Sequence, residues 1–205
     1  MTWVIFDYGN VISSPQPRAD LSAMATVARS QVRRFWDAYW LRRHDYDLAD
    51  LTAESYWQTV AAQLERSWDG SRTAELVRLD LASWSHVRPD TVRLIEEVAA
   101  AGHRLAMLSN APYEIADGVA ALPVVDRFEH LLFSCHLRAA KPDPRIFQVT
   151  LTRLGAEPRN AIFIDDRPEN VAAAARVGIH AIHFTSPEAA RAQLKEAGAI
   201  IQARS

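Results

Sequence analysis

The chain has 205 residues, 49% of them hydrophobic and 23% charged, a composition typical of a globular protein with one good core and untypical of disordered or fibrous chains. Its formal net charge of −2 gives no electrostatic reason to expect nucleic acid or an anionic membrane as a partner. The single cysteine, Cys135, excludes an internal disulfide, and the N-terminal stretch resembles neither a secretion signal nor a membrane anchor. We therefore expect a cytoplasmic protein, either a monomer or a homodimer.

Short apolar segments alternate with longer amphipathic ones after residue 86. Five apolar segments predict buried strands because each is too short for an ordinary helix: 2–6, 104–110, 130–134, 161–165 and 179–184. Proline near the start and glycine just past the end predict helices over 89–101, 144–154, 168–177 and 187–197. This alternation predicts an α/β fold, in which helices cover both faces of a Rossmann-like parallel sheet.

The first strand is separated from its partner helix by a long segment with helical patterns and no β run. Residues 18–40 carry apolar residues at helical spacing, and Thr52 is placed to cap a helix that runs to Leu64. We therefore expect a small α-helical cap domain over residues 14–86, inserted after the first strand. The core domain then comprises residues 1–13 and 87–205.

The expected cap contains five of the six tryptophans and a group of basic residues. The tryptophans either pack a small helical core, which we favour, or line a substrate pocket: Trp36, Trp40, Trp57, Trp68 and Trp84. The basic residues are expected to form a solvated face: Arg29, Arg33, Arg34, Arg42 and Arg43.

Polar residues stand at the carboxyl ends of three predicted strands, where open parallel sheets bind ligands. Carboxylates clustered in a cleft repel one another, and a hard divalent cation relieves the repulsion, commonly Mg²⁺ when phosphate is the other ligand. A lysine in the loop after strand 130–134 can supply a compact positive charge. The residues concerned are Asp7, Ser109, Asn110, Lys141, Asp165 and Asp166.

The ordered set FDYGNV, LSN, KP and IDD resembles the four motifs of the haloacid dehalogenase (HAD) superfamily, and the helical insertion resembles the cap that follows its first motif. The resemblance implies a Mg²⁺-dependent phosphatase in which Asp7 forms an aspartyl-phosphate and Ser109 and Lys141 hold the phosphoryl group. It also implies metal ligands from Asp7, the Gly9 carbonyl, Asp166 directly and Asp165 through water. The predicted substrate contacts are Gly9, Asn10, His44 and Asn110.

Position 9 departs from the family's commonest pattern, which has a second aspartate two residues after the nucleophile to act as general acid and base. That assistance is typically worth about 10²- to 10⁴-fold. Either the substrate has a good leaving group, or a cap residue (His44, Asp45 or Asp47) supplies the proton, or the enzyme is slow or inactive. The closely similar FD-x-GNV pattern resembles α-glucose-1-phosphatase-like sugar-phosphate phosphatases and favours the first explanation.

The sequence is also compatible with two other functions. A metal-independent 2-haloacid dehalogenase also uses an aspartate nucleophile, but the paired acids at 165 and 166 favour magnesium and phosphate. A catalytically impaired HAD-fold binding protein is the alternative from another class. The segment 44–52 is either the substrate-specificity loop or an ordinary acidic turn, and Arg138 is a weaker candidate for contact with a substrate anion.

Overall fold

A parallel five-stranded sheet lies at the centre of the structure, a computed structural model that describes residues 2–200. The strands follow the order β3-β2-β1-β4-β5, and each neighbouring pair is parallel. This confirms the expected sheet and all five of its strands. Their bounds are β1 Trp3–Phe6, β2 Arg104–Ser109, β3 His130–Phe133, β4 Ala161–Asp165 and β5 His180–His183.

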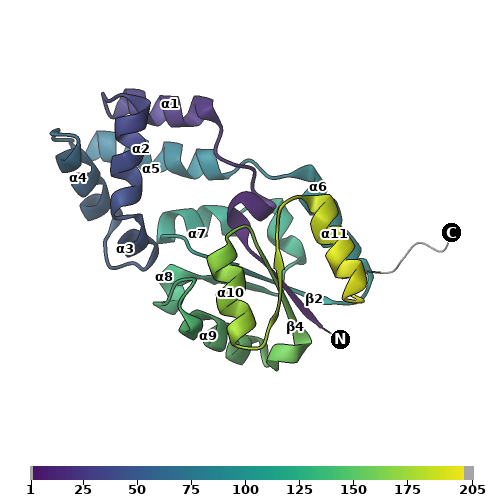
Figure 1. The fold of residues 1–205 in the computed structure, drawn as a ribbon. Helices are drawn as coiled ribbons and strands as arrows, with labels where there is room; N and C mark the ends of the chain where they lie inside the picture. Colours follow the sequence, from purple (N-terminus) through teal and green to yellow (C-terminus); the bar gives the residue numbers. More distant parts are fainter. Residues whose placement is uncertain (1, 201–205) are drawn as a thin grey trace.

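Helices and short turns connect these strands (Figure 1). Between β1 and β2 lie η1 Tyr8–Ile12, α1 Arg18–Val27, α2 Val32–Leu41, α3 Arg43–Asp47, α4 Ala53–Gln63, α5 Gly70–Trp84 and α6 Pro89–Ala100. After β2 come α7 Tyr113–Ala120, η2 Pro123–Arg127, α8 Ser134–Leu137, α9 Pro144–Leu154, η3 Pro158–Asn160, α10 Pro168–Arg176 and α11 Pro187–Glu196.

Helices cover both faces of the sheet, as predicted. Successive side chains of a strand point to opposite faces. In β1, Val4 and Phe6 belong to the apolar cluster that contains α6, α7 and α11, whereas Trp3 and Ile5 belong to the cluster that contains α9 and α10. Both faces of the strand are therefore buried, which explains its continuous run of apolar residues.

The order in which strands are added to the sheet switches sides at β1. The strand that follows it in sequence, β2, pairs on one side, and β4 pairs on the other. The backbone N–H of Asp7 donates to the carbonyl of Ile164 at 2.9 Å, which continues the β1-β4 pairing to the end of the strand. Asp7 and Asp165 thus lie side by side at the carboxyl edge, where ligands bind in folds of this type.

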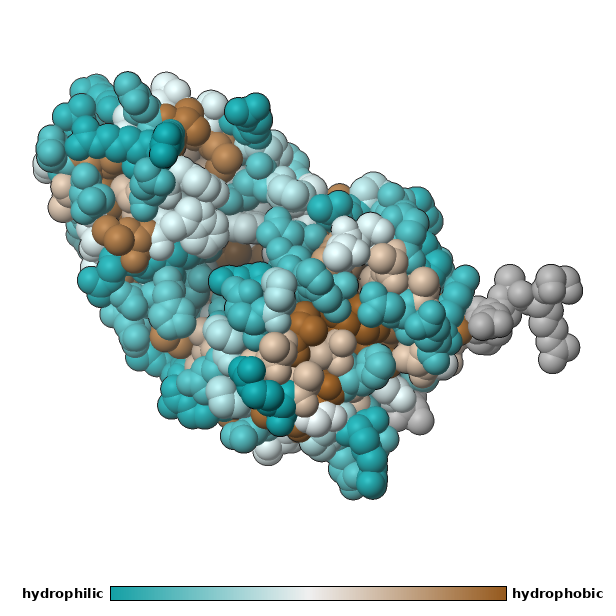
Figure 2. Space-filling model, in the orientation of Figure 1, coloured by the Kyte–Doolittle hydropathy of each residue, from teal (hydrophilic) through white to brown (hydrophobic). Residues whose placement is uncertain are grey.

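The helices α1–α5, called the cap helices below, gather at one end of the molecule (Figure 1). They enclose their own apolar cluster, in which the largest fully buried side chains are Phe35, Tyr39, Tyr56 and Trp57. The Thr52 hydroxyl accepts a hydrogen bond from the backbone N–H of Ser55 at 3.2 Å, as predicted for an N-cap. In Figure 2 these helices form the upper left lobe, and most of the surface in that view is hydrophilic.

The longest core helix absent from the sequence prediction is α7. It packs against α5 through Gly118, where an added Cβ would lie 2.1 Å from Cδ1 of Leu81. A glycine inside a helix usually lowers helix propensity, but here its missing side chain gives the cap helix room. The contact sets how closely the cap helices approach the core.

Within residues 2–200, the helices are too short or too polar to cross a bilayer.

Candidate active site

Asp7 follows β1 directly and is 6% exposed. Its Oδ1 atom accepts a hydrogen bond from the backbone N–H of Tyr8 at 2.7 Å and lies 2.7 Å from Nζ of Lys141. Burial raises the pKa of Asp7 to about 8; attraction to Lys141 opposes this shift, and repulsion from Asp165 adds to it. Its other oxygen, Oδ2, makes no hydrogen bond to any of residues 2–200.

Lys141 is 2% exposed and bridges two carboxylates. Its Nζ lies 2.7 Å from Asp7 Oδ1 and 2.6 Å from Asp165 Oδ2, and it donates to the carbonyl of Leu108 at 2.9 Å. Burial disfavours the ammonium ion, but the two carboxylates outweigh burial and raise the pKa of Lys141. The lysine is therefore fully charged at neutral pH, although it lies inside the protein.

Asn110 fixes the loop that carries Lys141. Its side-chain amide donates to the Lys141 carbonyl at 2.8 Å, and its Oδ1 accepts from the Lys141 backbone N–H at 2.9 Å. Asn110 was predicted to contact substrate. Asn110 does border the cavity described below, but both the NH2 group and the oxygen of its amide are used to position Lys141.

The two acids at the end of β4 have different surroundings. Asp165 is completely buried, and both of its oxygens accept hydrogen bonds, from Lys141, the backbone N–H of Arg167 and the side chain of Asn170. Asp166 is half-buried, and its Oδ2 accepts from Asn10 at 2.9 Å. Asp165 therefore has little remaining capacity to bind a metal ion directly, whereas Asp166 has more.

This cluster fits a divalent cation. Oxygens of Asp7, Asp165 and Asp166 lie within 4.8 Å of one another, and carboxylate oxygens are the ligands that Mg²⁺ prefers. Asn170 is 2% exposed, and its Oδ1 is buried without a hydrogen-bond partner in the described part of the chain. An unpaired buried acceptor beside such a cluster suits a metal-bound water.

Sequence reasoning missed Asn170. The signal available was its position one helical turn after Asp166, at the start of α10. A polar residue there is equally compatible with an exposed helix face, so its burial against Asp165 could be found only in the folded structure.

A cavity of about 350 Å³ lies between this cluster and the cap helices. It brings together all but one of the predicted site residues, including Gly9 and His44; Asp165 lies behind the lining, against Lys141. The core contributes Asp7, Tyr8, Gly9, Asn10, Ser109, Asn110, Ala111, Ile115, Lys141, Pro142, Asp166, Arg167 and Asn170. The cap helices contribute Trp40, Arg43, His44, Asp47 and Trp84.

Of the five tryptophans in residues 14–86, some pack the helical core and others line the cavity. Trp57 and Trp68 are buried in the cap cluster, and Trp36 packs against it. Trp40 and Trp84 border the cavity. The segment 44–52, considered as a substrate-specificity loop or an acidic turn, begins inside α3. Two of its residues, His44 and Asp47, border the cavity.

The prediction that Arg43 belongs to a solvated basic face was wrong. Arg43 is 4% exposed; its Nε donates to Asp47 Oδ1 at 2.7 Å, its Nη1 lies 3.4 Å from Asp80 Oδ2, and Nη1 also contacts the Tyr39 hydroxyl. A buried guanidinium needs such partners, because an unpaired buried charge is strongly disfavoured. Arg43 and Asp47 stand four residues apart on α3, a spacing that favours ion pairs on helices.

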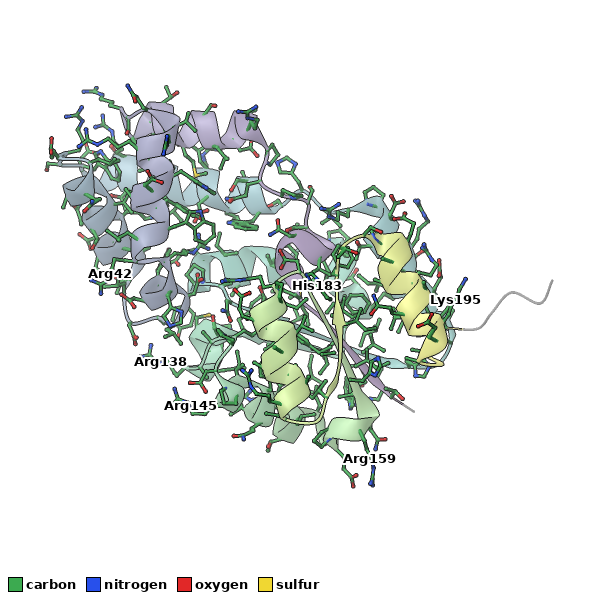
Figure 3. All side chains as sticks on the ribbon, in the orientation of Figure 1. Arg42, Arg138, Arg145, Arg159, His183 and Lys195 are labelled. Atoms are coloured by element: carbon green, nitrogen blue, oxygen red, sulfur yellow. The ribbon has the colours of Figure 1, made fainter. Side chains whose placement is uncertain are left out.

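Arg138, considered as a contact for a substrate anion, instead joins the core to the end of α3. It donates to the carbonyl of Leu48 and to Asp50 Oδ1, both at 2.7 Å, and it does not border the cavity. In Figure 3 it lies at the surface below α3.

The side chain of Trp84 occupies the space in front of Gly9. A Cβ on Gly9 would lie 3.5 Å from Cζ3 of Trp84, an ordinary van der Waals contact, so the ring limits any longer side chain. Trp84 is held at two points: its carbonyl accepts from the Tyr8 hydroxyl at 2.7 Å, and its Nε1 donates to the Tyr39 hydroxyl at 3.3 Å.

Substitutions at Gly9 should reveal this limit. Gly9 has φ −62° and ψ 129°, which alanine adopts readily, so Gly9→Ala should raise the free energy of unfolding by about 0.4–1 kcal/mol. For the phosphatase activity that the sequence predicts, Gly9→Asp should bring no gain in hydrolysis of alkyl phosphates unless Trp84→Ala removes the ring; the double variant should gain about 10-fold or more over Gly9→Asp. A gain from Gly9→Asp alone, measured as phosphate release, would contradict this steric account.

Comparison with known proteins identifies the family. The profile described as "Hydrolase: haloacid dehalogenase-like hydrolase" matches residues 1–178. Phosphatase MT3486 of Mycobacterium tuberculosis is 27% identical over 187 residues, which are 87% of this chain and 84% of that protein. Mouse acyl-CoA dehydrogenase family member 10 is 39% identical over 109 residues, which are 52% of this chain but 10% of that protein.

Solved structures agree in fold. A HAD family enzyme of Bacteroides thetaiotaomicron, in complex with magnesium and inorganic phosphate, has a TM-score of 0.70 at 18% sequence identity, covering 89% of this chain and 93% of that one. At this identity the similarity concerns the fold alone. The family match over residues 1–178, together with the sheet and cap-helix arrangement, shows that this chain is a hydrolase of the haloacid dehalogenase family.

Proposed function

We propose that this hydrolase is a Mg²⁺-dependent phosphatase that acts on a small phosphorylated metabolite, such as a sugar phosphate, through an aspartyl-phosphate on Asp7. The observation that carries the proposal is the buried arrangement of Asp7, Lys141 and the two acids at the end of β4. Phosphatase MT3486 and the phosphoglycolate phosphatase of Rhodospirillum rubrum, which is 26% identical over 86% of this chain, support it.

Phosphoryl transfer depends mainly on positioning and charge stabilisation, and each site residue is proposed to contribute to one of these. The unbonded Oδ2 of Asp7 attacks phosphorus, the Ser109 hydroxyl holds a phosphoryl oxygen, and the positive charge of Lys141 stabilises the phosphoryl group beside Asp7. Asp7, Asp166 and the carbonyl of Gly9 would hold the magnesium, with Asp165 behind them. When bound, the ion offsets the repulsion between the Asp7 carboxylate and the phosphate dianion.

The proposed cap domain, residues 14–86, closes the cavity over the substrate. A cavity of about 350 Å³ is near the lower end of the range for small-molecule sites, and this supports a substrate of modest size. Carboxylate, guanidinium and indole groups from the cap helices provide hydrogen bonds and flat apolar surfaces, a combination that suits a polyhydroxylated leaving group.

Dehalogenation is the second candidate, because (S)-2-haloacid dehalogenase 4A of Burkholderia cepacia is 30% identical over 47% of this chain. The acid cluster of Asp7, Asp165 and Asp166 favours the phosphatase, since a metal-independent displacement has no need of it. The two reactions release different anions and can be measured on one preparation.

The purified protein should release phosphate from p-nitrophenyl phosphate with Mg²⁺, lose this activity with EDTA, and regain it when Mg²⁺ is added back. A panel of phosphorylated metabolites should then show a preference for sugar phosphates. Halide release from 2-haloacids in EDTA, without phosphate release, would replace the proposal by the dehalogenase. Absence of both activities would favour a binding protein.

A further inference from the structure

Position 9 carries no acid, so any general acid that assists the leaving oxygen must be another group in the cavity. In the described part of the chain, the carboxylates that line the cavity are Asp7, Asp47 and Asp166. Asp7 and Asp166 belong to the nucleophile and metal cluster. Asp47, at the end of α3, is the remaining carboxylate.

The main chain of Asp47 is joined to the loop after β2, which carries Ser109 and Asn110 at its start. The Ser134 hydroxyl, which is completely buried, donates to the Asp47 carbonyl at 2.6 Å and accepts from the backbone N–H of Ala111 at 3.0 Å. Ala111 is two residues from Ser109. One hydroxyl group therefore joins this cap residue to the loop that holds the phosphoryl group, and it fixes the distance between them.

The side chain of Asp47 is suited to carry a proton. Its Oδ1 accepts from Arg43 Nε at 2.7 Å, while its Oδ2 makes no hydrogen bond to any of residues 2–200. Burial raises the pKa of Asp47 and is opposed by the charge of Arg43. Arg43 is itself held by Asp80. The Asp47 carboxyl group is therefore oriented through its Oδ1 atom, while its Oδ2 atom is free.

His44 also borders the cavity, but its position suits another role. It is exposed, and it also lines a separate surface depression with Leu48, Asp50 and Arg138. Asp47 is 9% exposed. A group that transfers a proton during phosphoryl transfer acts best where water is excluded, and this favours Asp47.

We propose that Asp47 is the general acid and base of the phosphatase reaction proposed above, on which this inference depends. As Asp7 attacks, the P–O bond to the leaving group breaks, and the leaving oxygen takes its proton from the Asp47 carboxyl. In the second step Asp47 accepts a proton from the attacking water, the acyl-phosphate P–O bond breaks, and Asp7 regains its electron pair. Inorganic phosphate leaves and Asp47 is protonated again.

The test is the dependence of kcat/KM on the leaving group in Asp47→Asn. Loss of a proton donor should lower hydrolysis of alkyl phosphates by about 10²- to 10³-fold and that of p-nitrophenyl phosphate far less, because nitrophenolate needs little protonation. Asp47→Glu, which keeps the acid, should recover part of the alkyl activity. With p-nitrophenyl phosphate, Asp47→Asn should show a burst of nitrophenolate, because the second step has lost its base.

Two matched variants separate chemistry from folding. Asp45→Asn removes a neighbouring carboxylate that pairs with Arg42 outside the cavity and should leave all rates unchanged. Asp80→Asn removes the other partner of Arg43 but keeps the Asp47 carboxyl, so it should lower thermal stability and steepen the dependence on the leaving group far less than Asp47→Asn does. Equal losses on alkyl and aryl phosphates in Asp47→Asn would overturn the role of Asp47 while leaving the phosphatase standing. An inactive wild type would overturn both.

Discussion

Asp7→Asn should abolish turnover, with a loss of about 10⁴-fold or more in kcat on every phosphate ester. An amide nitrogen or oxygen does not replace the carboxylate oxygen proposed to attack phosphorus, and no other carboxylate that lines the cavity within residues 2–200 contacts Lys141. Phosphate release at high enzyme concentration measures the loss. Residual turnover within about 10-fold of wild type would exclude Asp7 as nucleophile.

The same variant should be more stable than the wild type when metal is removed by EDTA. Because the pKa of Asp7 in the folded protein is about 8, above its ordinary 3.8, the group contributes its full stability below pH 3.8 and loses it as pH rises through 8. Asparagine lacks this dependence. Thermal unfolding at pH 5 and pH 8 should therefore show a larger advantage for Asp7→Asn at pH 8, and a lower melting temperature at both values would contradict the argument.

Lys141→Met should lower both activity and stability. It removes the ammonium that pairs with both Asp7 and Asp165 and leaves these two buried carboxylates without that positive charge. Breaking a buried ion pair from one side typically costs about 3–5 kcal/mol of unfolding free energy. We expect that loss at neutral pH, with a decrease in kcat/KM of about 10³-fold or more.

The chain supplies a matched control, because its only other lysine is Lys195. Lys195 lies on α11, at the opposite end of the molecule from the cap helices in Figure 3. Lys195→Met should leave kcat/KM and the free energy of unfolding nearly unchanged, as is usual for surface positions. Denaturant unfolding and phosphate release test both variants, and equal effects of the two substitutions would contradict the role given to Lys141.

The pH dependence of stability provides a second check on Lys141→Met. Without the ammonium, the pKa of Asp7 should rise further, because its carboxylate loses its nearest positive charge. Protonation at pH 5 then relieves the repulsion, so the loss of stability should be smaller there than at pH 8. A loss independent of pH would indicate that packing, and not charge, is the cause.

Local sequence patterns determined the sheet and the positions of the reactive groups. Each core strand is a short apolar run, and a polar residue that follows such a run lies at the sheet edge regardless of what the rest of the chain does. Asp7, Ser109 and Asp165 could therefore be placed at one edge from the sequence. Helix α7 escaped prediction because its glycine is explained only by the side chain of Leu81, far away in the chain.

Only the tertiary structure decided which cap residues face that edge. Arg43 has the sequence features of a solvated residue, yet it is buried, because Asp80 of α5 reaches it in addition to Asp47 of its own helix. The ring of Trp84 lies in front of Gly9, 75 positions away in the chain, and the hydroxyl of Ser134 joins the Asp47 carbonyl to the backbone N–H of Ala111, in the loop after β2. Such contacts depend on the packing of one layer of helices against another, and no local pattern encodes that arrangement.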